Sequence, residues 1–286
     1  MDFAFLKEYL WEPERFQAMN GLANSVFGID FSAWVASGAP DGSYRPYSFF
    51  DGERCVSNVS SSRMVFRHHG RTLTALQLGT VMTDPEYRGR GLAGELLERA
   101  VADRPEPFCF LFAGESRHSF YEAHGFRRAD VLHAYATEEL RGKTYENRRL
   151  DLSKTADLGI LFKYMRAAAP QTDHMRLCST RALSEIYLFG SYKKCAYYFP
   201  NCSAVLIIEK DGKNASVIEA FASKPHDASW FARRAWSVFP NAERILFGFL
   251  PEKGAGLLKL EQGPDELMVR GDAPDEPLLV PVLART

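Results

Sequence analysis

The sequence has no excess of charge of one sign and no long apolar run. Its 286 residues carry 35 Lys and Arg against 36 Asp and Glu, a net charge of -1, so no overall field would attract nucleic acid or an anionic membrane. No window approaches the ~20 apolar residues that span a bilayer. We therefore expect neither a nucleic-acid nor a membrane partner, and any bound anion must be held by a local arrangement of residues.

Cysteine is scarce and scattered. The five cysteines form no CxxC pair and no metal-type cluster with histidine, so neither a disulfide framework nor a zinc site is expected. His68 and His69 fall at a predicted hairpin turn and are interpreted as an exposed loop feature rather than a metal pair. The N-terminus mixes charged with apolar residues, unlike a signal peptide. We predict a cytoplasmic protein without a metal.

What the sequence does contain is the composition of a globular protein, with 46% hydrophobic and 25% charged residues. The length fits two domains of ordinary size, and we place the boundary between residues 150 and 151. Apolar periodicity predicts alternating helices and strands in the first unit. The expected elements are a helical segment over 3–34, a loop over 37–47, strands over 54–67 and 73–83, a helix from residue 92, a strand over 108–112 and a short helix over 116–124.

The second half has one clear hairpin, residues 204–221, with Asp211-Gly212 at its turn. A helix over 227–239 and a strand over 244–249 should follow. This order is compatible with a second, degenerate copy of the first unit's fold or with an unrelated α+β domain. The tail from Gly263 to Thr286 is rich in proline and acidic residues, which predicts irregular structure.

The stretch TVMTDPEYRGRGLA, residues 80–93, carries the chemistry. An apolar strand ends at Thr83, and a loop with two arginines and two glycines leads directly into an amphipathic helix. Glycines allow a ligand to approach the backbone, and the first helical amides have no intrahelical acceptor. The helix dipole and the arginines add positive potential. This pattern indicates a diphosphate site, while GxxxxGK[ST] and GxGxxG are both absent.

The residues resemble a known family at this point. Arg88-x-x-Gly91-x-Ala93, preceded by Pro85-Glu86-Tyr87, resembles motif A of the GNAT-type N-acetyltransferases. Downstream, Phe120-Tyr121-Glu122-Ala123-His124-Gly125-Phe126 is similar to the (F/L)YxxxGF segment of the same family. The two matches occur in the family's order, with a helix and a strand between them. The resemblance covers roughly residues 1–150.

The resemblance implies a fold and an activity. The fold is α/β of the α+β type, the GNAT fold, with a central mixed, mostly antiparallel sheet flanked by helices in residues 1–150. Residues 151–286 would form a second GNAT-like or α+β domain, without a CoA site because its connection ASKPHDAS has no glycine. The activity is direct transfer of the acetyl group of acetyl-CoA to a primary amine of a small molecule or peptide, and a homodimer is allowed. A non-catalytic acyl-CoA-binding sensor or an interaction module stays open as the alternative.

The resemblance also assigns roles to residues. Tyr121 matches the tyrosine that protonates the departing thiolate, a role that suits a phenol. Where the family often has an asparagine, this chain has Gly114-Glu115-Ser116, so Glu115 becomes a candidate base. Acceptor specificity would come from residues 28–47, which include Asp30, Trp34, Tyr44 and Tyr47. The expected cofactor-binding residues are Val81, Met82 and Thr83 for the pantetheine and acetyl group, and Arg88, Gly89, Arg90, Gly91, Leu92 and Ala93 for the diphosphate.

Overall fold

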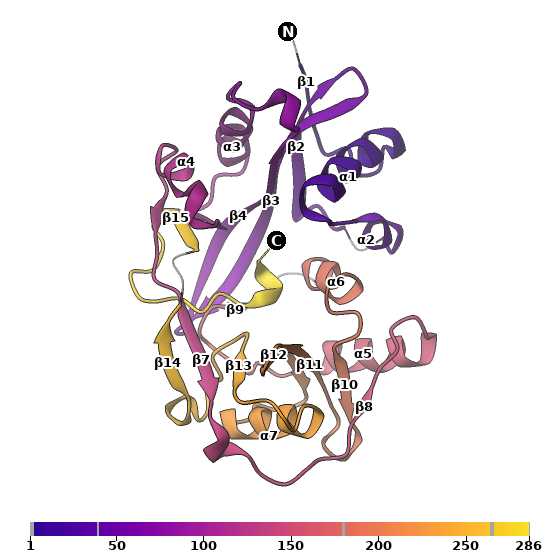
Figure 1. The fold of residues 1–286 in the computed structure, drawn as a ribbon, viewed down its shortest axis with the longest axis vertical. Helices are drawn as coiled ribbons and strands as arrows, with labels where there is room; N and C mark the ends of the chain where they lie inside the picture. Colours follow the sequence, from indigo (N-terminus) through magenta and orange to yellow (C-terminus); the bar gives the residue numbers. More distant parts are fainter. Residues whose placement is uncertain (1–2, 39, 179–180, 264–265, 286) are drawn as a thin grey trace.

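The structure, a computed structural model, describes residues 3–38, 40–178, 181–263 and 266–285. It has two lobes, each built on one sheet with helices packed against its faces (Figure 1). None of the described helices is both long and apolar enough to cross a membrane.

The first sheet is antiparallel except where β4 and β5 run parallel. A further short strand, β9 (Arg176–Leu177), pairs with the outer part of β3. The strand order is β1 (Ala4–Lys7), β2 (Tyr44–Asp51), β3 (Arg54–His68), β4 (Arg71–Thr83), β5 (Phe108–Phe112), β15 (Leu267–Gly271) and β6 (Arg127–Arg128).

The second sheet repeats this arrangement, again with one parallel pair, β12 with β13. Its order is β8 (Arg148–Arg149), β10 (Ala196–Phe199), β11 (Ala204–Asp211), β12 (Asn214–Ala222), β13 (Ile245–Phe247), β7 (Leu132–Ala136) and β14 (Lys259–Gln262). Taken from β1 and from β8, the two sheets have the same succession of antiparallel and parallel neighbours. Of the two alternatives for the second half, this succession favours a second copy of the same fold.

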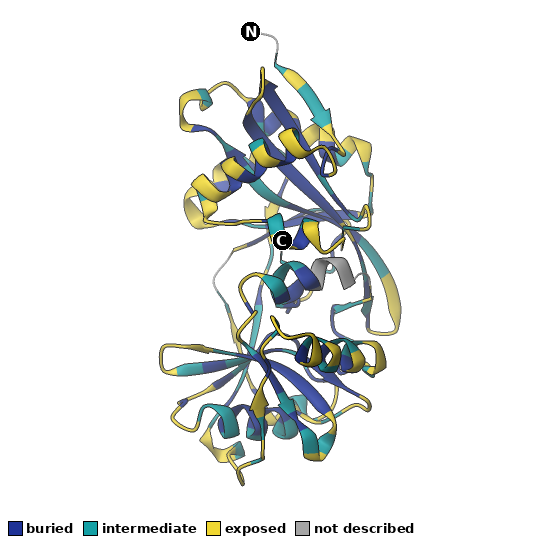
Figure 2. Cartoon of the chain, turned by 90° about the vertical axis from the view of Figure 1, so that its right-hand side faces the viewer, coloured by how far each residue is buried: buried dark blue, intermediate teal, exposed yellow. Residues whose placement is uncertain are grey.

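Helices cover both faces of each sheet, and alternating strand residues supply the two cores. In β5, Phe108 and Phe110 pack under α1, whereas Cys109 and Leu111 pack under α3. Figure 2 shows the same division, with the strands buried and the outer sides of the helices exposed. The helices are α1 (Pro13–Phe27), α2 (Ser32–Ala36), α3 (Leu92–Asp103) and α4 (His118–Glu122) on the first sheet, and α5 (Thr155–Ala167), α6 (Arg181–Phe189) and α7 (Ala228–Val238) in the second lobe.

The lobes exchange strands. β15, near the C-terminus, lies between β5 and β6 of the first sheet and pairs with β5 from Leu267–Phe112 to Gly271–Phe108. In return β7 lies between β13 and β14 of the second sheet. The predicted boundary between residues 150 and 151 thus leaves β7 and β8 of the second sheet on its N-terminal side and β9 and β15 of the first sheet on its C-terminal side.

Three sequence predictions are wrong. The segment expected to be helical from residue 3 begins with strand β1, and α1 starts at Pro13, whose fixed φ and missing N–H suit the first helical position. The expected loop over 37–47 already contains the first residues of β2. The tail expected to be irregular contains β15, because pairing with a strand more than 150 residues away leaves no local periodicity to read.

Candidate active site

The end of β4 separates from β5. The two strands pair in parallel only from Ala75–Phe108 to Gln77–Phe110, although β4 runs on to Thr83. The register of β4 against β3 also shifts here, and Thr80 has a φ of +44°, rare for a threonine. A bulge of this kind bends a strand and re-aims its backbone groups. The predicted thioester-binding segment, Val81 to Thr83, therefore lies on the part of β4 without a β5 partner.

Side chains of β3 hold the bulge in place. Asn58 Nδ2 donates to the carbonyl of Thr80 at 2.9 Å, and Ser57 Oγ donates to the carbonyl of Met82 at 3.1 Å. Both side chains are fully buried, where such hydrogen bonds are costly to lose. Neither Asn58 nor Ser57 was expected to contribute to the site. Their signal was visible as a polar run within a strand that otherwise packs on both faces.

The loop after β4 carries two arginines that bond to its own backbone. Arg88 Nε donates to the carbonyl of Thr83 at 3.2 Å, and Arg90 donates to the carbonyl of Glu86 at 3.0 Å. Both residues are exposed. The loop is thus a positively charged surface turn of defined conformation, beside the end of β4 as the sequence predicted.

The glycines of this loop are required by the backbone. Gly89 and Gly91 have φ of +75° and +74°, and a Cβ atom at either position would meet nothing within 4 Å. The left-handed conformation, rather than crowding, therefore selects glycine. Gly91 is the N-cap of α3 and offers no side chain to the first-turn amides of Leu92 and Ala93. This helix start is open to an external anion.

The corresponding helix of the second lobe begins differently. Asp227 caps α7, and its Oδ1 accepts the N–H of Trp230 at 2.9 Å and the hydroxyl of Ser229 at 2.6 Å. The carboxylate occupies the position that a diphosphate would need and would repel it. The two copies of the fold therefore differ at the helix start: α3 can receive an anion, and α7 cannot.

Tyr121 lies on α4 with its side chain 7% exposed. It packs with Leu92 of α3 and Ala113 after β5 in one apolar cluster, and its ring contacts Phe126 at a centroid distance of 6.0 Å. Burial raises the pKa of its phenol to about 12. The structure therefore places Tyr121 on the α3 side of the sheet, next to the end of β5.

Glu115 and His118, which follow β5, differ in exposure. Glu115 lies in a 3-10 turn and is exposed. His118, which the sequence analysis did not single out, is 3% exposed and bonds through Nε2 to the carbonyl of Ala113 at 2.9 Å. Its Nδ1 is buried without a hydrogen-bond partner among the described residues. Such a buried lone pair can accept a hydrogen bond from a bound ligand.

Three aromatic residues of the segment expected to select the acceptor lie in the core, whereas Asp30 is exposed. Trp34, Tyr44 and Tyr47 are all less than 5% exposed. The Tyr44 hydroxyl lies 3.2 Å from Thr80 Oγ1 of the bulge, so this aromatic side chain connects the α2 face with the end of β4. A cavity of about 220 Å³ adjoins Tyr44 and is also lined by Glu8 and Trp11.

Four residues far apart in sequence meet beside the β3–β4 turn. Atoms of His68, His69, His174 and Glu276 lie within 4.8 Å of one another. The interpretation of His68 as an exposed loop residue is wrong, since it is 6% exposed. The N–H of Met175 donates to its Nδ1 at 3.2 Å, so in the neutral ring Nε2 carries the proton and donates to Glu276 at 2.8 Å. In this tautomer His68 Nε2 is a donor and not a metal ligand.

Comparison with known proteins identifies the first lobe. Residues 11–129 match the family model described as an acetyltransferase (GNAT) domain. The family resemblance is therefore confirmed for these residues, which are less than half of the chain. No curated protein matches the sequence.

Solved structures share the two-lobed fold at low identity. A probable N-acyltransferase from Enterococcus faecalis superposes with a TM-score of 0.59 and 16% identity, covering 94% of this chain and 72% of that one. GCN5-related N-acetyltransferases from Kribbella flavida and Anabaena variabilis both have TM-scores of 0.55, with 16% and 13% identity; they cover 93% of this chain and 71% and 72% of their own. The predicted fold class is confirmed across both lobes.

Proposed function

We propose that the protein is an acetyl-CoA-dependent N-acetyltransferase of the cytoplasm that acetylates a primary amine of a small molecule or peptide. The observation that carries the proposal is the start of α3, where the N-cap is a left-handed glycine without a capping side chain and is preceded by Arg88 and Arg90. A diphosphate would supply acceptors for the first-turn amides and counter-charges for the arginines.

Acetyl-CoA would supply an activated thioester, and the residues of this chain would guide its reaction with the amine. Backbone N–H groups between Val81 and Thr83 would donate to the carbonyl oxygen, where negative charge develops. As the C–N bond forms and the C–S bond breaks, Tyr121 would give its proton to the sulfur. Glu115 would take the proton that leaves the amine nitrogen, directly or through a water.

The acceptor would enter from the face covered by α1 and α2. Supporting this choice, the cavity beside Tyr44 lies on that face, and the Tyr44 hydroxyl reaches Thr80 of the β4 bulge. The side chain of Glu8 at the cavity would attract a cationic amine, although it also pairs with Arg45.

A matched pair of variants tests the diphosphate site. Asparagine and aspartate both tolerate a left-handed backbone better than other side chains and differ in charge, so Gly91→Asn and Gly91→Asp isolate electrostatics from strain. We expect acetyl-CoA to raise the melting temperature of the wild type and to raise that of Gly91→Asn less. The melting temperature of Gly91→Asp should not change. At 100 times the Kd, a ligand adds about 2.7 kcal/mol of stability.

A control variant and a measurement of turnover complete this test. The control Arg71→Gln, an exposed arginine at the opposite end of β4, should keep the full thermal shift. Absence of a shift in the wild type at millimolar acetyl-CoA would contradict the proposal. A wild-type shift without release of free CoA in the presence of a broad panel of amines would favour the sensor.

A further inference from the structure

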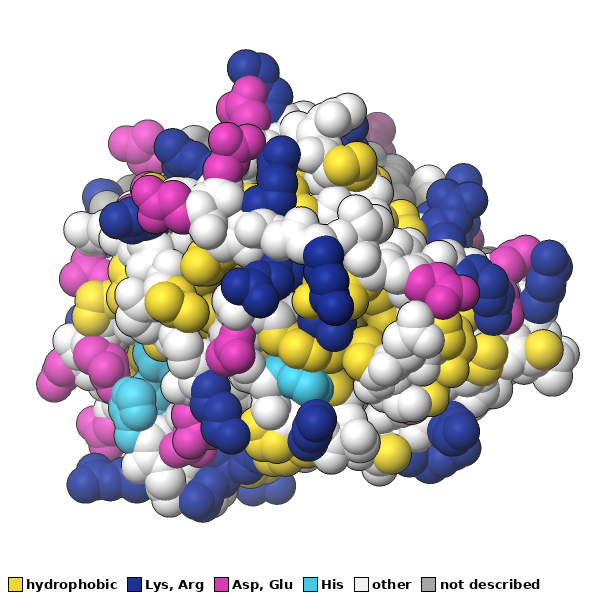
Figure 3. Space-filling view, turned by 90° about the horizontal axis from the view of Figure 1, so that it is seen from below, with side chains coloured by type: hydrophobic (Ala, Val, Ile, Leu, Met, Phe, Trp, Pro, Cys, Tyr) yellow, Lys and Arg dark blue, Asp and Glu magenta, His cyan; other side chains and the backbone are white. Residues whose placement is uncertain are grey.

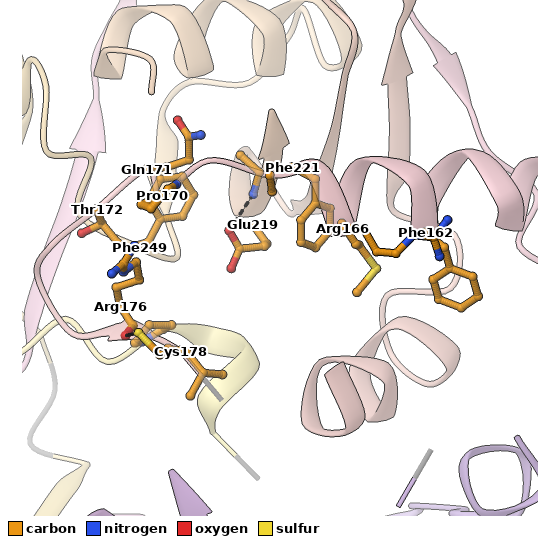
Figure 4. A pocket seen from close by; sticks show the side chains of 15 residues that line it. Phe162, Arg166, Pro170, Gln171, Thr172, Arg176, Cys178, Glu219, Phe221 and Phe249 are labelled. Carbon is orange, nitrogen blue, oxygen red and sulfur yellow. Dashed lines mark hydrogen bonds between the residues drawn. The ribbon is translucent and has the colours of Figure 1, made fainter. Parts of the chain in front are cut away.

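The second lobe has a cavity of its own, away from the GNAT site. It measures about 460 Å³ and is bordered by α5, the segment around β9 and the ends of β12 and β13 (Figure 4). This volume is typical of small-molecule sites. Its wall includes Glu219 and Phe221 of β12 and Phe249 after β13.

The cavity occupies the same place in its sheet as the predicted thioester site in the first. β12 and β13 pair in parallel only from Ala215–Ile245 to Val217–Phe247. The register of β12 against β11 shifts just before Glu219, as that of β4 shifts before Met82. Both copies therefore have a bulge and a strand separation, and the first paired residue after the bulge is Glu219 in the second copy and Met82 in the first.

Acetyl-CoA does not suit this cavity, because Asp227 caps α7 and the connection before it contains no glycine. The cavity is also remote from the first site. Arg176 and Leu177 of its wall pair with Arg67 and Phe66 of β3, whereas Met82 pairs with Asn58. Eight residues of strand separate these points, roughly 26 Å. The face of the molecule at the α7 end carries both acidic and basic side chains (Figure 3), so this face has no charge of a single sign.

Three charged side chains line this cavity, Arg166 of α5, Arg176 and Glu219, and among the described residues neither arginine forms an ion pair with Glu219. Arg176 Nε is buried and has no hydrogen-bond partner among the described residues. One oxygen of Glu219 accepts the N–H of Ala220 at 2.8 Å, and burial raises the pKa of this carboxyl to about 7. A cation beside Glu219 would oppose that rise. Figure 4 shows Glu219 lying between Arg176 on one side and Arg166 and Phe162 of α5 on the other.

We propose that this cavity binds a small zwitterion with an apolar body, that is, an aromatic or aliphatic α-amino acid. The ligand carboxylate pairs with the guanidinium of Arg176, which offers two parallel N–H groups to such a partner. The ligand ammonium pairs with Glu219. The apolar side chain packs against Met165, Phe221 and Phe249, which line the same space. Each part of the ligand satisfies a group that the protein leaves unsatisfied.

Calorimetric titration of the full chain tests the proposal with three probes that share a phenyl group. L-Phenylalanine has both charges, phenethylamine lacks the carboxylate, and 3-phenylpropanoate lacks the amine. We expect L-phenylalanine to bind at least ten-fold more tightly than either of the others. Equal affinities for the three probes would overturn the proposal. So would a lack of L-phenylalanine binding at about 10 mM, ten times the Kd of a weak, millimolar ligand.

Conservative variants assign the two contacts. Glu219→Gln should lower the affinity for L-phenylalanine to that of 3-phenylpropanoate and leave 3-phenylpropanoate binding unchanged. Arg176→Lys keeps the charge but loses the two parallel N–H groups of the guanidinium. It should weaken the binding of both carboxylate ligands without affecting that of phenethylamine. Thermal melts of each variant establish that it is folded. A folded Glu219→Gln variant with unchanged L-phenylalanine affinity would contradict the assigned contact.

The proposal is independent of acetyl-CoA binding, and one variant separates the two. Arg88→Gln changes the loop before α3 and should leave L-phenylalanine binding as in the wild type, while it weakens the acetyl-CoA thermal shift. Loss of L-phenylalanine binding in Arg88→Gln would place the ligand in the first lobe and overturn the second site.

Discussion

Tyr121 has a burial that suits a proton donor. Its phenol is 7% exposed and its pKa is raised by burial to about 12, so the hydroxyl stays protonated well above neutral pH. The residue that follows it on the same helix, Glu122, is instead exposed. Burial at one position and exposure at the next is what a short helix packed on one side produces.

We expect Tyr121→Phe to lower kcat by about 10²- to 10⁴-fold, the usual contribution of a positioned proton donor. The thermal shift caused by acetyl-CoA should change little, because the phenylalanine keeps the ring and its packing. Steady-state kinetics with an amine substrate, run beside the melt, checks both parts. Tyr135→Phe, on β7 of the second sheet, is the control. An unchanged kcat in Tyr121→Phe would remove the tyrosine from the reaction.

At the level of elements, the corresponding helices α3 and α7 differ in how their first-turn amides are satisfied. α3 begins at a glycine and keeps its amides for a ligand, whereas α7 begins at Asp227 and satisfies its amides internally. A capped helix start is more stable on its own, and an uncapped one gains stability when an anion binds.

Asp227→Ala should therefore reduce the free energy of unfolding by about 1 kcal/mol, within the usual range of about 0.5–2 kcal/mol for a lost N-cap. Urea unfolding measures this difference. Asp275→Ala serves as control, since that side chain is fully exposed and its loss should matter by less than about 0.5 kcal/mol. The acetyl-CoA shift should persist in both variants. A stability loss as large in Asp275→Ala would argue against the cap.

At the level of the whole molecule, the exchanged strands make each lobe depend on the other. Val269 of β15 is fully buried in the first sheet, although it follows the second lobe in sequence. Leu260 of β14 is of similar character but 52% exposed. The same substitution by a charged residue should therefore destabilise the protein far more at Val269 than at Leu260.

Val269→Asp should destabilise the protein by more than about 3 kcal/mol, because it places an unpaired charge in the core. It should also abolish the acetyl-CoA shift, since β15 borders β5. Leu260→Asp should cost less than about 0.5 kcal/mol and leave the shift intact. Denaturant unfolding and thermal shift report both effects. Equal, small losses would mean that the C-terminal strand is not part of the first sheet.

His174 joins the two lobes and gives stability a pH dependence. Its Nε2 accepts the N–H of Leu279 at 3.0 Å, and burial, with a contribution from His68, lowers its pKa to about 4. The unfolded chain, with a pKa near 6.5, binds a proton that the folded chain refuses. The contribution of His174 is therefore complete above about pH 6.5 and is lost as the pH falls towards 4.

His174→Gln removes this titration and keeps an acceptor for the Leu279 amide. We expect the melting temperature of the wild type to fall more steeply than that of His174→Gln between about pH 6.5 and 4, with the two curves parallel above about pH 7. Melts in a series of buffers of constant ionic strength give the comparison. Parallel curves throughout the acidic range would exclude His174 as the source.

The elements that carry the candidate site of the first lobe were largely readable from the sequence, because their signals are local. The strand over 108–112 and the helix from Leu92 have the predicted bounds, since alternation, helical spacing and glycine at the N-cap act over a few residues. The roles of Asn58 and Ser57 were not readable. Their polar character gave a signal, but the carbonyls they hold belong to a strand whose bulge forms only in the paired sheet.

Local sequence was enough to predict the glycine- and arginine-containing loop before α3, the hairpin–helix–strand order of the second half and the family resemblance of the first lobe, because each depends on neighbouring residues or on a short motif. Three other outcomes are settled only in the folded chain: which sheet receives β15 and β7, that His68, His174 and Glu276 meet, and that Glu219 and Arg176 face one cavity. These outcomes depend on contacts between residues about 40 to more than 200 positions apart. Such pairings are selected by burial and hydrogen bonding as the chain folds, and no short stretch of sequence encodes them.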